Sequence, residues 1–437
     1  MDVIIKNKRI LIAQPLIHGI NGSTVVTFEL AKALQEYGAK VTVYTCDYDN
    51  PAKKLFVDNH ITVDIAQNNP QYSLDDFDYI WTHSQILPLS IIEALSNKLP
   101  KKLPAFIFLH MSGMEWIPDE KPWIYDLENK LSSLSLFISE EVLEINNSML
   151  SQTIPKAFFR NPSPKNYYNR NNKPSPKLKK VLIVSNHPPH EILEAKDILS
   201  RQYGIKVTSL GENQDNYTLI SPNIIEDQDA IITIAKTVPY CLVSGTPVYV
   251  YDAFGGGPGW LNEQNFEKAK QRNFSGYQNH IYPNYVGKGF HPKNPEQIAK
   301  EIIEGYKSSL SFHQKHRKEF QKEFGIDTVL PNIFSQIKPR DIKSFSKPYA
   351  NAVKLSERFA ITRFELGGLS FNNNEYIKSL KTTQKNLESQ NADLALFKEK
   401  AEAVFNSKAY QLFEKTIKPY KKLKGRINNE ERKTRKN

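Results

Sequence analysis

The chain has 437 residues, of which 40% are hydrophobic and 24% charged, a composition typical of a folded protein with two or three domains. It contains no apolar run of about 18 residues, which excludes a membrane-spanning helix, and we expect no secretion signal at its N-terminus. Cys46 and Cys241 are far apart in the sequence, so we expect two buried thiols in a reducing cytoplasm rather than a disulfide.

The net charge of +11 is concentrated at the C-terminal end. Residues 407–437 hold eleven Lys or Arg against three Glu, a net charge of +8, which leaves only +3 for residues 1–406. The main body is therefore nearly neutral, and its net charge says little about its chemistry.

Residues 1–165 show the pattern of a first α/β domain. A strand at 9–13 leads into a glycine-containing loop at 14–21, a helix that Ser23 or Thr24 caps, and a second strand. The loop lacks the full G-x-G-x-x-G fingerprint of a dinucleotide site. The elements alternate as in a doubly wound parallel sheet. The expected strands are 9–13, 40–44, 61–65, 79–82, 105–109 and 134–138, and the expected later helices are 89–98 and 123–133.

A proline- and asparagine-rich stretch at 161–176 marks a linker, after which a second α/β pattern begins. Two similar α/β halves with a cleft between them are the expected architecture. Its strands are predicted at 180–185, 205–210, 230–234 and 247–251, and its helices at 189–202, 238–244, 294–308 and 311–324. The predicted divisions are a domain at 1–165, a linker at 166–176, a domain at 177–340, a connecting segment at 341–371 and a tail at 372–437.

A glycine-rich segment follows the 247–251 strand. Gly255, Gly256, Gly257 and Gly259 leave backbone N–H groups unshielded, so we expect a turn that approaches an anion closely. Open α/β sheets bind ligands just beyond the carboxyl ends of their strands. A tight surface turn without a ligand is the alternative.

The tail changes character from about residue 372. Leucines or alanine recur every seven residues, which predicts a coiled coil over 372–404 and a homo-oligomer; a single amphipathic helix on the globular body is the alternative. The repeating positions are Leu380, Leu387, Leu394 and Ala401, with companions at Ile377, Gln384, Asn391 and Lys398. The basic segment at 407–437 carries aromatics at helical spacing, which predicts an anionic membrane surface as its partner. Nucleic acid competes for this charge, but no DNA- or RNA-binding motif accompanies it, so we expect none to bind.

Seven short motifs, taken in order, resemble the family 4 class of GT-B glycosyltransferases, and the resemblance covers roughly residues 9–335. The motifs are at 14–22, 29–43, 79–84, 109–110, 137–141, 159–162 and 244–248. The G-x-P-V-Y-V-Y-D segment with the later N-F-S-G is similar to a subset of bacterial surface-polysaccharide enzymes. The family usually has two glutamates eight residues apart before G-x-P-V, and here Ile232 and Tyr240 occupy those positions.

The resemblance implies two Rossmann-like domains facing across a cleft. It also implies transfer of a sugar from a nucleotide-diphosphate donor to a glycan acceptor, possibly lipid-linked, in bacterial surface polysaccharide or glycoconjugate synthesis. Such enzymes generally need no metal, so we expect no cofactor. Together with the basic tail, this predicts a cytoplasmic protein peripheral to the inner face of the plasma membrane. The missing glutamates motivate the alternative, a non-catalytic scaffold partner of an active transferase. The D-x-D strings at 47–49 and 76–78 are interpreted as solvated loop carboxylates.

Two residues are the expected catalytic candidates. Lys236 precedes a helix that begins at Thr237, where its ammonium would stabilise the leaving diphosphate; a solvated surface lysine is the alternative. His110 ends a strand and is expected to face the reacting sugar; a structural histidine is the alternative. The other donor-binding candidates are Ser185, Asn186, Thr237, Asp252, Gly255, Gly256 and Gly257, of which Asp252 has turn capping as its alternative. The acceptor or cleft candidates are His18, Gly19, Gly22 and His83.

Overall fold

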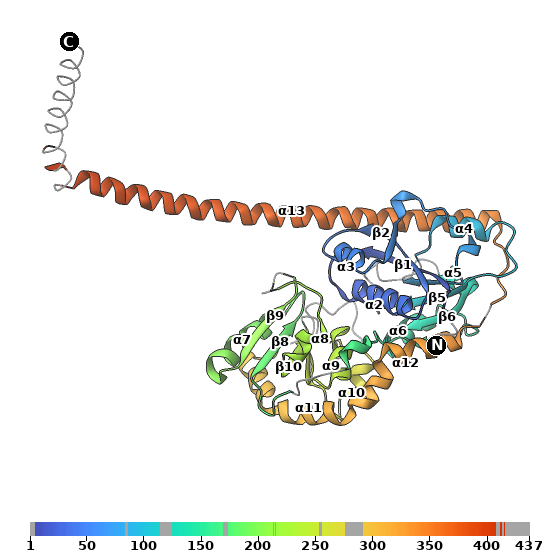
Figure 1. Cartoon of the computed structure of the whole chain (residues 1–437), viewed down its shortest axis with the longest axis horizontal. Helices are drawn as coiled ribbons and strands as arrows, with labels where there is room; N and C mark the ends of the chain where they lie inside the picture. The colour runs from blue at the N-terminus through green and yellow to red at the C-terminus, as the bar shows by residue number, and fades with distance from the viewer. Residues whose placement is uncertain are drawn as a thin grey trace, which may run out of the picture. The chain divides into compact units, whose positions relative to one another are not determined.

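The computed structural model contains two α/β lobes within one compact unit, Met1–Gly368, and a second unit, Leu369–Asn437 (Figure 1). The predicted fold class, two α/β domains followed by a C-terminal helical region, is confirmed. The structure describes residues 5–83, 86–113, 125–168, 174–212, 214, 216–252, 256–275, 292–338, 340–407, 411–412 and 415.

The first lobe is built on a parallel sheet that, in the described residues, has seven strands in the order β3-β2-β1-β4-β5-β6-β7. Chain order reverses between β1 and β4, as in a doubly wound fold. The strands are β1 (Arg9–Ile17), β2 (Lys40–Tyr48), β3 (Thr62–Ile65), β4 (Tyr79–His83), β5 (Ala105–His110), β6 (Ser132–Phe137) and β7 (Lys156–Phe158).

Helices cover both faces of this sheet. Side chains of α2 (Gly22–Glu36), α3 (Ala52–Asp58) and α6 (Glu140–Asn147) join one core cluster, and those of α4 (Leu89–Leu95) and α5 (Tyr125–Leu131) join the other. Strand β1 separates the two clusters because successive side chains point to opposite faces: Ile10 and Ile12 belong to one, Leu11 and Ala13 to the other. The short 3-10 helices are η1 (Ala66–Asn68), η2 (Leu74–Asp76) and η3 (Lys165–Tyr167).

The second lobe has a sheet that, where the structure describes it, runs in the order β12-β11-β10-β8-β9. The pairings are parallel except for β12, which lies antiparallel to β11 at one edge. The strands are β8 (Lys180–Val184), β9 (Lys206–Leu210), β10 (Ala230–Thr233), β11 (Val248–Asp252) and β12 (Gly256–Trp260). The helices are α7 (His190–Tyr203), α8 (Pro222–Glu226), α9 (Thr237–Ser244), α10 (Phe266–Lys270) and α11 (Pro295–Phe324).

Helix α12 (Ile326–Gln336) returns the chain to the first lobe. Its side chains Leu330 and Phe334 pack in the same core cluster as Trp81 and Phe159, with the Trp81 and Phe159 rings 5.3 Å apart. This helix falls within the range 177–340 that we expected for the donor domain, yet it completes the core of the other lobe (Figure 1).

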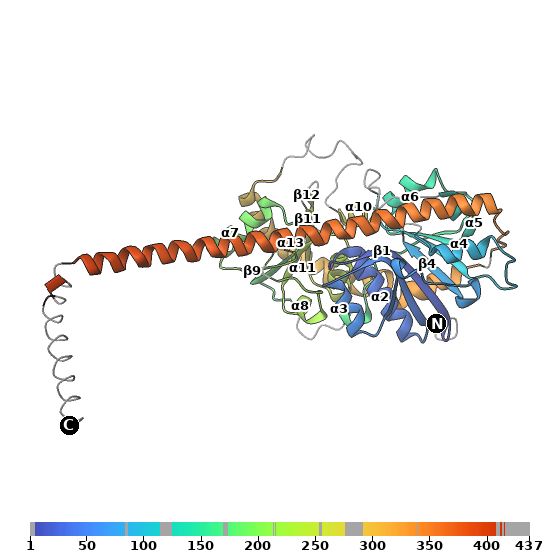
Figure 2. The same cartoon turned by 90° about the horizontal axis from the view of Figure 1, so that it is seen from above.

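Helix α13 (Lys347–Asn406) begins as part of the first lobe, where it lies over the sheet face that carries α4 and α5 (Figures 1 and 2). Val353, Ala360, Ile361 and Phe364 are buried in that core, so the expected connecting segment at 341–371 contributes to a folded lobe. The rest of α13 belongs to the second unit. Among the helices of the described ranges, none combines the length and the apolar character needed to cross a bilayer.

Four local predictions are wrong. Residues 256–260 form strand β12 rather than a turn, and one helix, α11, replaces the two expected at 294–308 and 311–324. The side chain of Asn21, not Ser23 or Thr24, caps α2 by accepting a hydrogen bond from Thr24 N at 3.0 Å. Strand β2 extends to Tyr48, so Asp47 lies in a strand instead of a solvated loop.

Candidate functional site

The predicted residues gather where the order of strands reverses in each sheet. In the first lobe, His18 and Gly19 follow β1 and His83 ends β4. In the second lobe, Ser185 and Asn186 follow β8, while Lys236 lies between β10 and α9. Doubly wound sheets bind ligands at these reversal points, because the loops there diverge to opposite faces of the sheet.

The two reversal points contact each other directly through the glycine loop of the first lobe. The backbone N–H of Ile20 donates to the Tyr217 hydroxyl at 2.7 Å, and the Asn186 side-chain amide donates to the Ile20 carbonyl at 3.3 Å. A Cβ added at Gly19 would lie only 2.9 Å from the same Tyr217 hydroxyl. The absence of a side chain at Gly19 therefore lets the second lobe approach this loop.

Lys236 and Glu29 form a buried ion pair between the lobes. Lys236 Nζ lies 2.6 Å from Glu29 Oε2, and the two residues are 7% and 6% exposed. The same ammonium donates to the carbonyl oxygens of Asn161 and Pro162, at 3.2 and 2.8 Å, in the segment that connects the lobes. Lys236 is thus not the solvated surface lysine of the alternative interpretation.

Two stacked tyrosines complete this buried network. The Tyr240 hydroxyl donates to Glu29 Oε1 at 2.5 Å, and the Lys236 ammonium lies 4.6 Å from the centroid of the Tyr240 ring. The Tyr240 ring stacks on Tyr167 with centroids 4.2 Å apart, and the Tyr167 hydroxyl donates to the Ile220 carbonyl at 2.5 Å. Both oxygens of Glu29 therefore have partners from the second lobe.

Burial and charge act in opposite directions on this pair. Burial raises the pKa of Glu29, and the neighbouring Lys236 ammonium opposes that shift. Burial likewise lowers the pKa of Lys236, and the Glu29 carboxylate opposes it. With three oxygens around the ammonium, the charged form of the pair is the one that satisfies every donor.

Two histidines at the ends of first-lobe strands are buried in polar contacts. His18 Nε2 lies 2.5 Å from Asp47 Oδ2, so this carboxylate contacts a buried imidazole and is not a solvated loop carboxylate. His83 Nδ1 lies 2.5 Å from Gln14 Oε1, and burial lowers the pKa of His83 to about 3. His83 is therefore a neutral imidazole at neutral pH.

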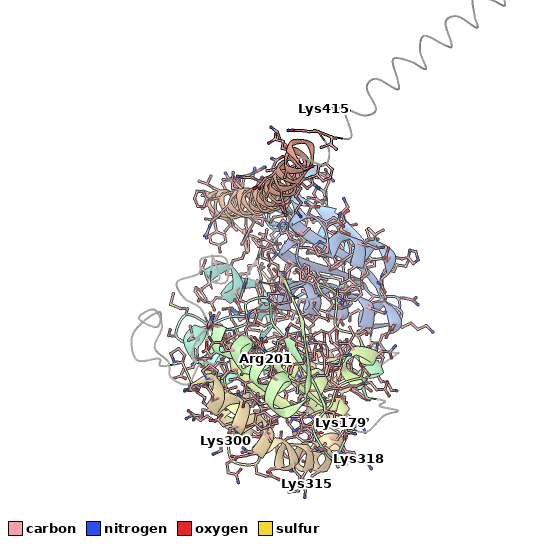
Figure 3. All side chains as sticks on the ribbon, turned by 90° about the vertical axis from the view of Figure 1, so that its left-hand side faces the viewer. Lys179, Arg201, Lys300, Lys315, Lys318 and Lys415 are labelled. Carbon is pink, nitrogen blue, oxygen red and sulfur yellow. The ribbon has the colours of Figure 1, made fainter. Side chains whose placement is uncertain are left out.

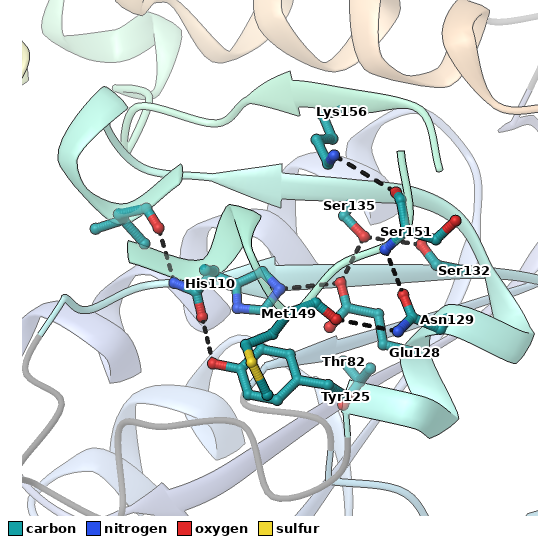
Figure 4. Close-up of polar contacts among 12 residues, drawn as sticks. Thr82, His110, Tyr125, Glu128, Asn129, Ser132, Ser135, Met149, Ser151 and Lys156 are labelled. Atoms are coloured by element: carbon teal, nitrogen blue, oxygen red, sulfur yellow. Dashed lines mark hydrogen bonds and ion pairs between the residues drawn. The ribbon is translucent and has the colours of Figure 1, made fainter. Parts of the chain in front are cut away.

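His110 occupies an interior position at the end of β5 (Figure 4). Its Nε2 lies 2.9 Å from Glu128 Oε1, which also accepts from the Ser135 hydroxyl at 2.5 Å. The imidazole stacks on Phe137 with centroids 4.9 Å apart and is 4% exposed. We expected His110 to face the reacting sugar, but the structure directs its imidazole toward Glu128 and gives it no contact with Lys236 in the described residues.

The glycine segment differs most from expectation. Gly256 and Gly257 are buried strand residues of β12, and a Cβ at Gly257 would lie 2.2 Å from the Val250 carbonyl oxygen, so glycine here serves strand packing. Asp252 ends β11 opposite Gly256 and is 5% exposed. Gly255 lies outside the described residues.

Sequence reasoning missed Glu29, Tyr240 and Tyr217 as members of this site. For Glu29 a signal existed: it shares the apolar face of α2 with Val26 and Ala33, where a carboxylate requires a buried partner. Tyr240 was noted only because it replaces a family glutamate. Nothing in the sequence around Tyr217 points to its contact with Ile20.

The remaining candidates line the same region in local roles. Thr237 is the first residue of α9 and 8% exposed, and the Ser185 hydroxyl accepts from His187 N at 3.1 Å. A Cβ at Gly22 would lie 3.9 Å from Lys236 Cβ, an ordinary contact. Within the described ranges, no group of three or more His, Cys, Asp or Glu is arranged to hold a metal ion.

No family model and no curated protein matches the chain. Solved structures with a similar arrangement include a glycosyltransferase from Rickettsia africae ESF-5, with a TM-score of 0.48 and 15% identity over 76% of this chain and 98% of that one. TarM has a TM-score of 0.47 and 11% identity over 77% of this chain and 100% of its own. Sucrose-phosphate synthase from Thermosynechococcus elongatus has a TM-score of 0.46 and 10% identity, over 76% of this chain and 99% of its own.

Proposed function

We propose that this protein is a nucleotide-sugar-dependent glycosyltransferase of the GT-B type. It transfers a sugar from a nucleotide-diphosphate donor to a glycan acceptor in bacterial cell-surface polysaccharide or glycoconjugate synthesis. The observation that carries the proposal is the meeting of two strand-reversal points from two doubly wound sheets, with the Lys236 ammonium between them. That is where such sheets bind nucleotides.

The chemistry needs a positive group beside the leaving diphosphate, because negative charge develops there as the sugar departs. Lys236 provides this charge without a metal ion. In the present structure Glu29 holds the ammonium, so a bound diphosphate would take over from the Glu29 carboxylate as its partner. We assign Ser185, Asn186 and Thr237 to the donor side, since they follow β8 or begin α9 in the second lobe. We assign His18, Gly19, Gly22 and His83 to the acceptor side, since they belong to the first lobe.

A second function is favoured by one specific observation. Tyr240 stands where the resembling family has a glutamate, and its hydroxyl is bonded to Glu29 rather than free for a sugar. Ile232, at the other glutamate position, is 3% exposed in the core. A non-catalytic GT-B scaffold that binds an active transferase would tolerate both replacements.

Nucleotide binding separates the two functions. The enzyme proposal expects UDP, GDP or dTDP to bind by isothermal titration calorimetry and the corresponding nucleotide sugar to be slowly hydrolysed. Lys236→Gln should weaken binding at least about tenfold through loss of one charge-assisted contact. Lys318→Gln is the matched control, since Lys318 extends outward from α11 (Figure 3). If none of the three nucleotides binds the wild-type protein, the scaffold is favoured.

We further propose that the protein is cytoplasmic and peripheral to the inner face of the plasma membrane through residues 407–437. The net charge of +8 in this segment supports attraction to anionic lipid, at about 1 kcal/mol per cation near the surface. Sedimentation with phosphatidylserine-containing liposomes should retain the full chain and release a variant lacking 407–437. Equal sedimentation of the full chain and the shortened variant would contradict the membrane role of residues 407–437. Salt-sensitive binding of the full chain to DNA, without liposome binding, would also contradict it.

A further inference from the structure

Helix α13 has two opposite apolar faces where it crosses the first lobe. One face is buried: Val353, Ile361 and Phe364 lie in the core of the lobe. On the other face Leu355 is 73% exposed and Leu366 is 60% exposed. A helix that only covered the lobe would need the first face alone, so the second face requires its own explanation.

The exposed residues follow a heptad repeat that continues to the end of the helix. Counting in sevens from Ala352 defines the a positions, and counting from Leu355 defines the d positions. The a series is Ala352, Phe359, Leu366, Asn373, Leu380, Leu387, Leu394 and Ala401, and the d series is Leu355, Thr362, Leu369, Tyr376, Thr383, Gln390, Phe397 and Val404. Only four of these positions are polar, and Leu387, Leu394 and Phe397 are 54%, 64% and 72% exposed.

This register differs from the companion positions expected from the tail alone. Ile377 and the polar residues at 384, 391 and 398 lie four residues after an a position, whereas the proposed d positions fall three residues after it and include Phe397, which is 72% exposed. The seam therefore extends over eight heptads, 352–404, and includes the part of α13 that belongs to the first lobe.

The other face of the helix changes where the lobe ends. At the b, c and f positions, Val353, Ala360, Ile361 and Phe364 are apolar and buried against the lobe. Beyond Gly368 these positions are mostly polar, with Phe371, Ala392, Ala395, Leu396 and Ala403 as the apolar exceptions. The lobe-facing stripe becomes mixed in character there, while leucine or alanine recurs at every a position from 380 to 401, which indicates a separate partner for the a/d stripe.

We propose that this partner is a second copy of the chain, joined in a parallel, two-stranded coiled coil over residues 352–404. A parallel pairing places Asn373 against Asn373 of the second copy, and a single buried asparagine at an a position fixes register and favours two strands. It also places Asp393 at a g position opposite Lys398 of the second copy at e. One like-charge pair, Arg358 with Arg363 of the second copy, opposes the pairing at the lobe end.

Over residues 352–366 the first lobe does not cover the proposed seam. The buried side chains there occupy b, c and f positions, which lie on the opposite side of the helix from a and d. Eight heptads give a seam of about 80 Å at 1.5 Å per residue, well beyond the length at which coiled coils become stable.

Sedimentation equilibrium of the full chain tests the pairing. We expect a dimer, and we expect Leu387→Glu with Leu394→Glu to raise its Kd at least about 100-fold, since charges enter the seam. Leu396→Glu is the matched control, because Leu396 is 49% exposed at a c position, outside the seam. A wild-type monomer, a trimer, or an equal effect of the control would overturn the proposal.

Two further variants test its extent and direction. Leu355→Gln with Leu366→Gln should raise the Kd at least about tenfold if the seam includes the lobe; an unchanged Kd would overturn the eight-heptad interface. Asn373→Cys should form an intermolecular disulfide on oxidation, because in-register a positions face each other. The native Cys46 and Cys241 are buried and outside any disulfide. Dimers that do not crosslink at 373 would contradict parallel pairing.

Discussion

The Lys236 ammonium of the second lobe lies 2.6 Å from the Glu29 carboxylate of the first. The one buried lysine at the junction of the lobes is thus held in a contact that spans them, among the residues that the structure describes. A ligand anion that binds Lys236 must compete with Glu29, so donor binding and the contact between the lobes are linked. This relationship leads to the predictions that follow.

Breaking one side of the pair should be more harmful than removing both sides. Lys236→Met leaves the Glu29 carboxylate buried without its cation, which costs about 3–5 kcal/mol. Glu29→Met does the converse, while the double variant buries no unpaired charge and should be destabilised by less than the sum of the two single changes. Urea unfolding followed by tryptophan fluorescence measures all three. Additive effects would contradict direct coupling.

Tyr240 should contribute through its hydroxyl. Tyr240→Phe keeps the ring that stacks on Tyr167 but leaves Glu29 Oε1 without this donor, and the cost should be about 1–3 kcal/mol. Tyr203→Phe is the control, since Tyr203 is 46% exposed at the end of α7. Thermal unfolding compares the two variants, and equal Tm values for them would refute the hydrogen bond as a stabilising contact.

The glycine loop should tolerate a side chain at one glycine and not at another. Gly19→Ala forces the Tyr217 hydroxyl away from Ile20 N and should cost about 1–3 kcal/mol for the lost bond. Gly22→Ala meets no atom closer than 3.9 Å in the first turn of α2 and should be neutral or slightly stabilising. Urea midpoints of both variants provide the comparison. A greater loss for Gly22→Ala would show that the loop does not contact Tyr217 as described.

Glu357 should make stability fall as pH rises. Burial in α13 raises the pKa of Glu357 from 4.5 to about 8, with a weak donor at Leu87 N, 3.4 Å away. Between these two pKa values the folded state retains a proton that the unfolded state releases. The contribution of Glu357 to the free energy of unfolding is therefore complete below pH 4.5 and decreases by about 1.4 kcal/mol per pH unit up to pH 8. Glu357→Gln should remove this dependence.

Urea midpoints at pH 5, 6, 7 and 8 measure the effect. The advantage of Glu357→Gln over the wild type should grow across this series. Glu93→Gln is a suitable control, because the pKa of Glu93 is lowered by its hydrogen bond to Lys354 at the surface. A constant difference between Glu357→Gln and wild type would mean that Glu357 is ionised in the folded protein.

The sequence predicted ten of the twelve described strands, because each of these is a short apolar run with turn residues at its ends, but it missed the short strand β7. It failed at β12, where four glycines within residues 255–259 were interpreted as a turn, although the lack of a side chain at Gly257 lets β12 pack beside Val250. It also split α11 at Ser309, a residue whose hydroxyl donates to the Leu261 carbonyl at 3.1 Å and is buried by tertiary contact. In both places, contacts between residues that are far apart in the sequence determine the secondary structure.

The sequence predicted where the candidate residues lie in the fold, but it did not predict which side chains contact them. Strand ends in a doubly wound sheet are recognisable from the chain, and His18, His83, Asn186 and Lys236 all lie at the expected edges. Which side chains meet there depends on how two lobes dock, and no local pattern encodes that. The proposed heptad register likewise depends on the exposure of Leu355, which the sequence does not give.

The most direct test of the account is the affinity of the full chain for UDP, GDP and dTDP, compared between wild type, Lys236→Gln and Lys318→Gln. The account predicts that one nucleotide binds, that Lys236→Gln weakens it at least about tenfold, and that Lys318→Gln leaves it unchanged. Binding that is equal in all three proteins would contradict the role of Lys236 at the junction of the lobes.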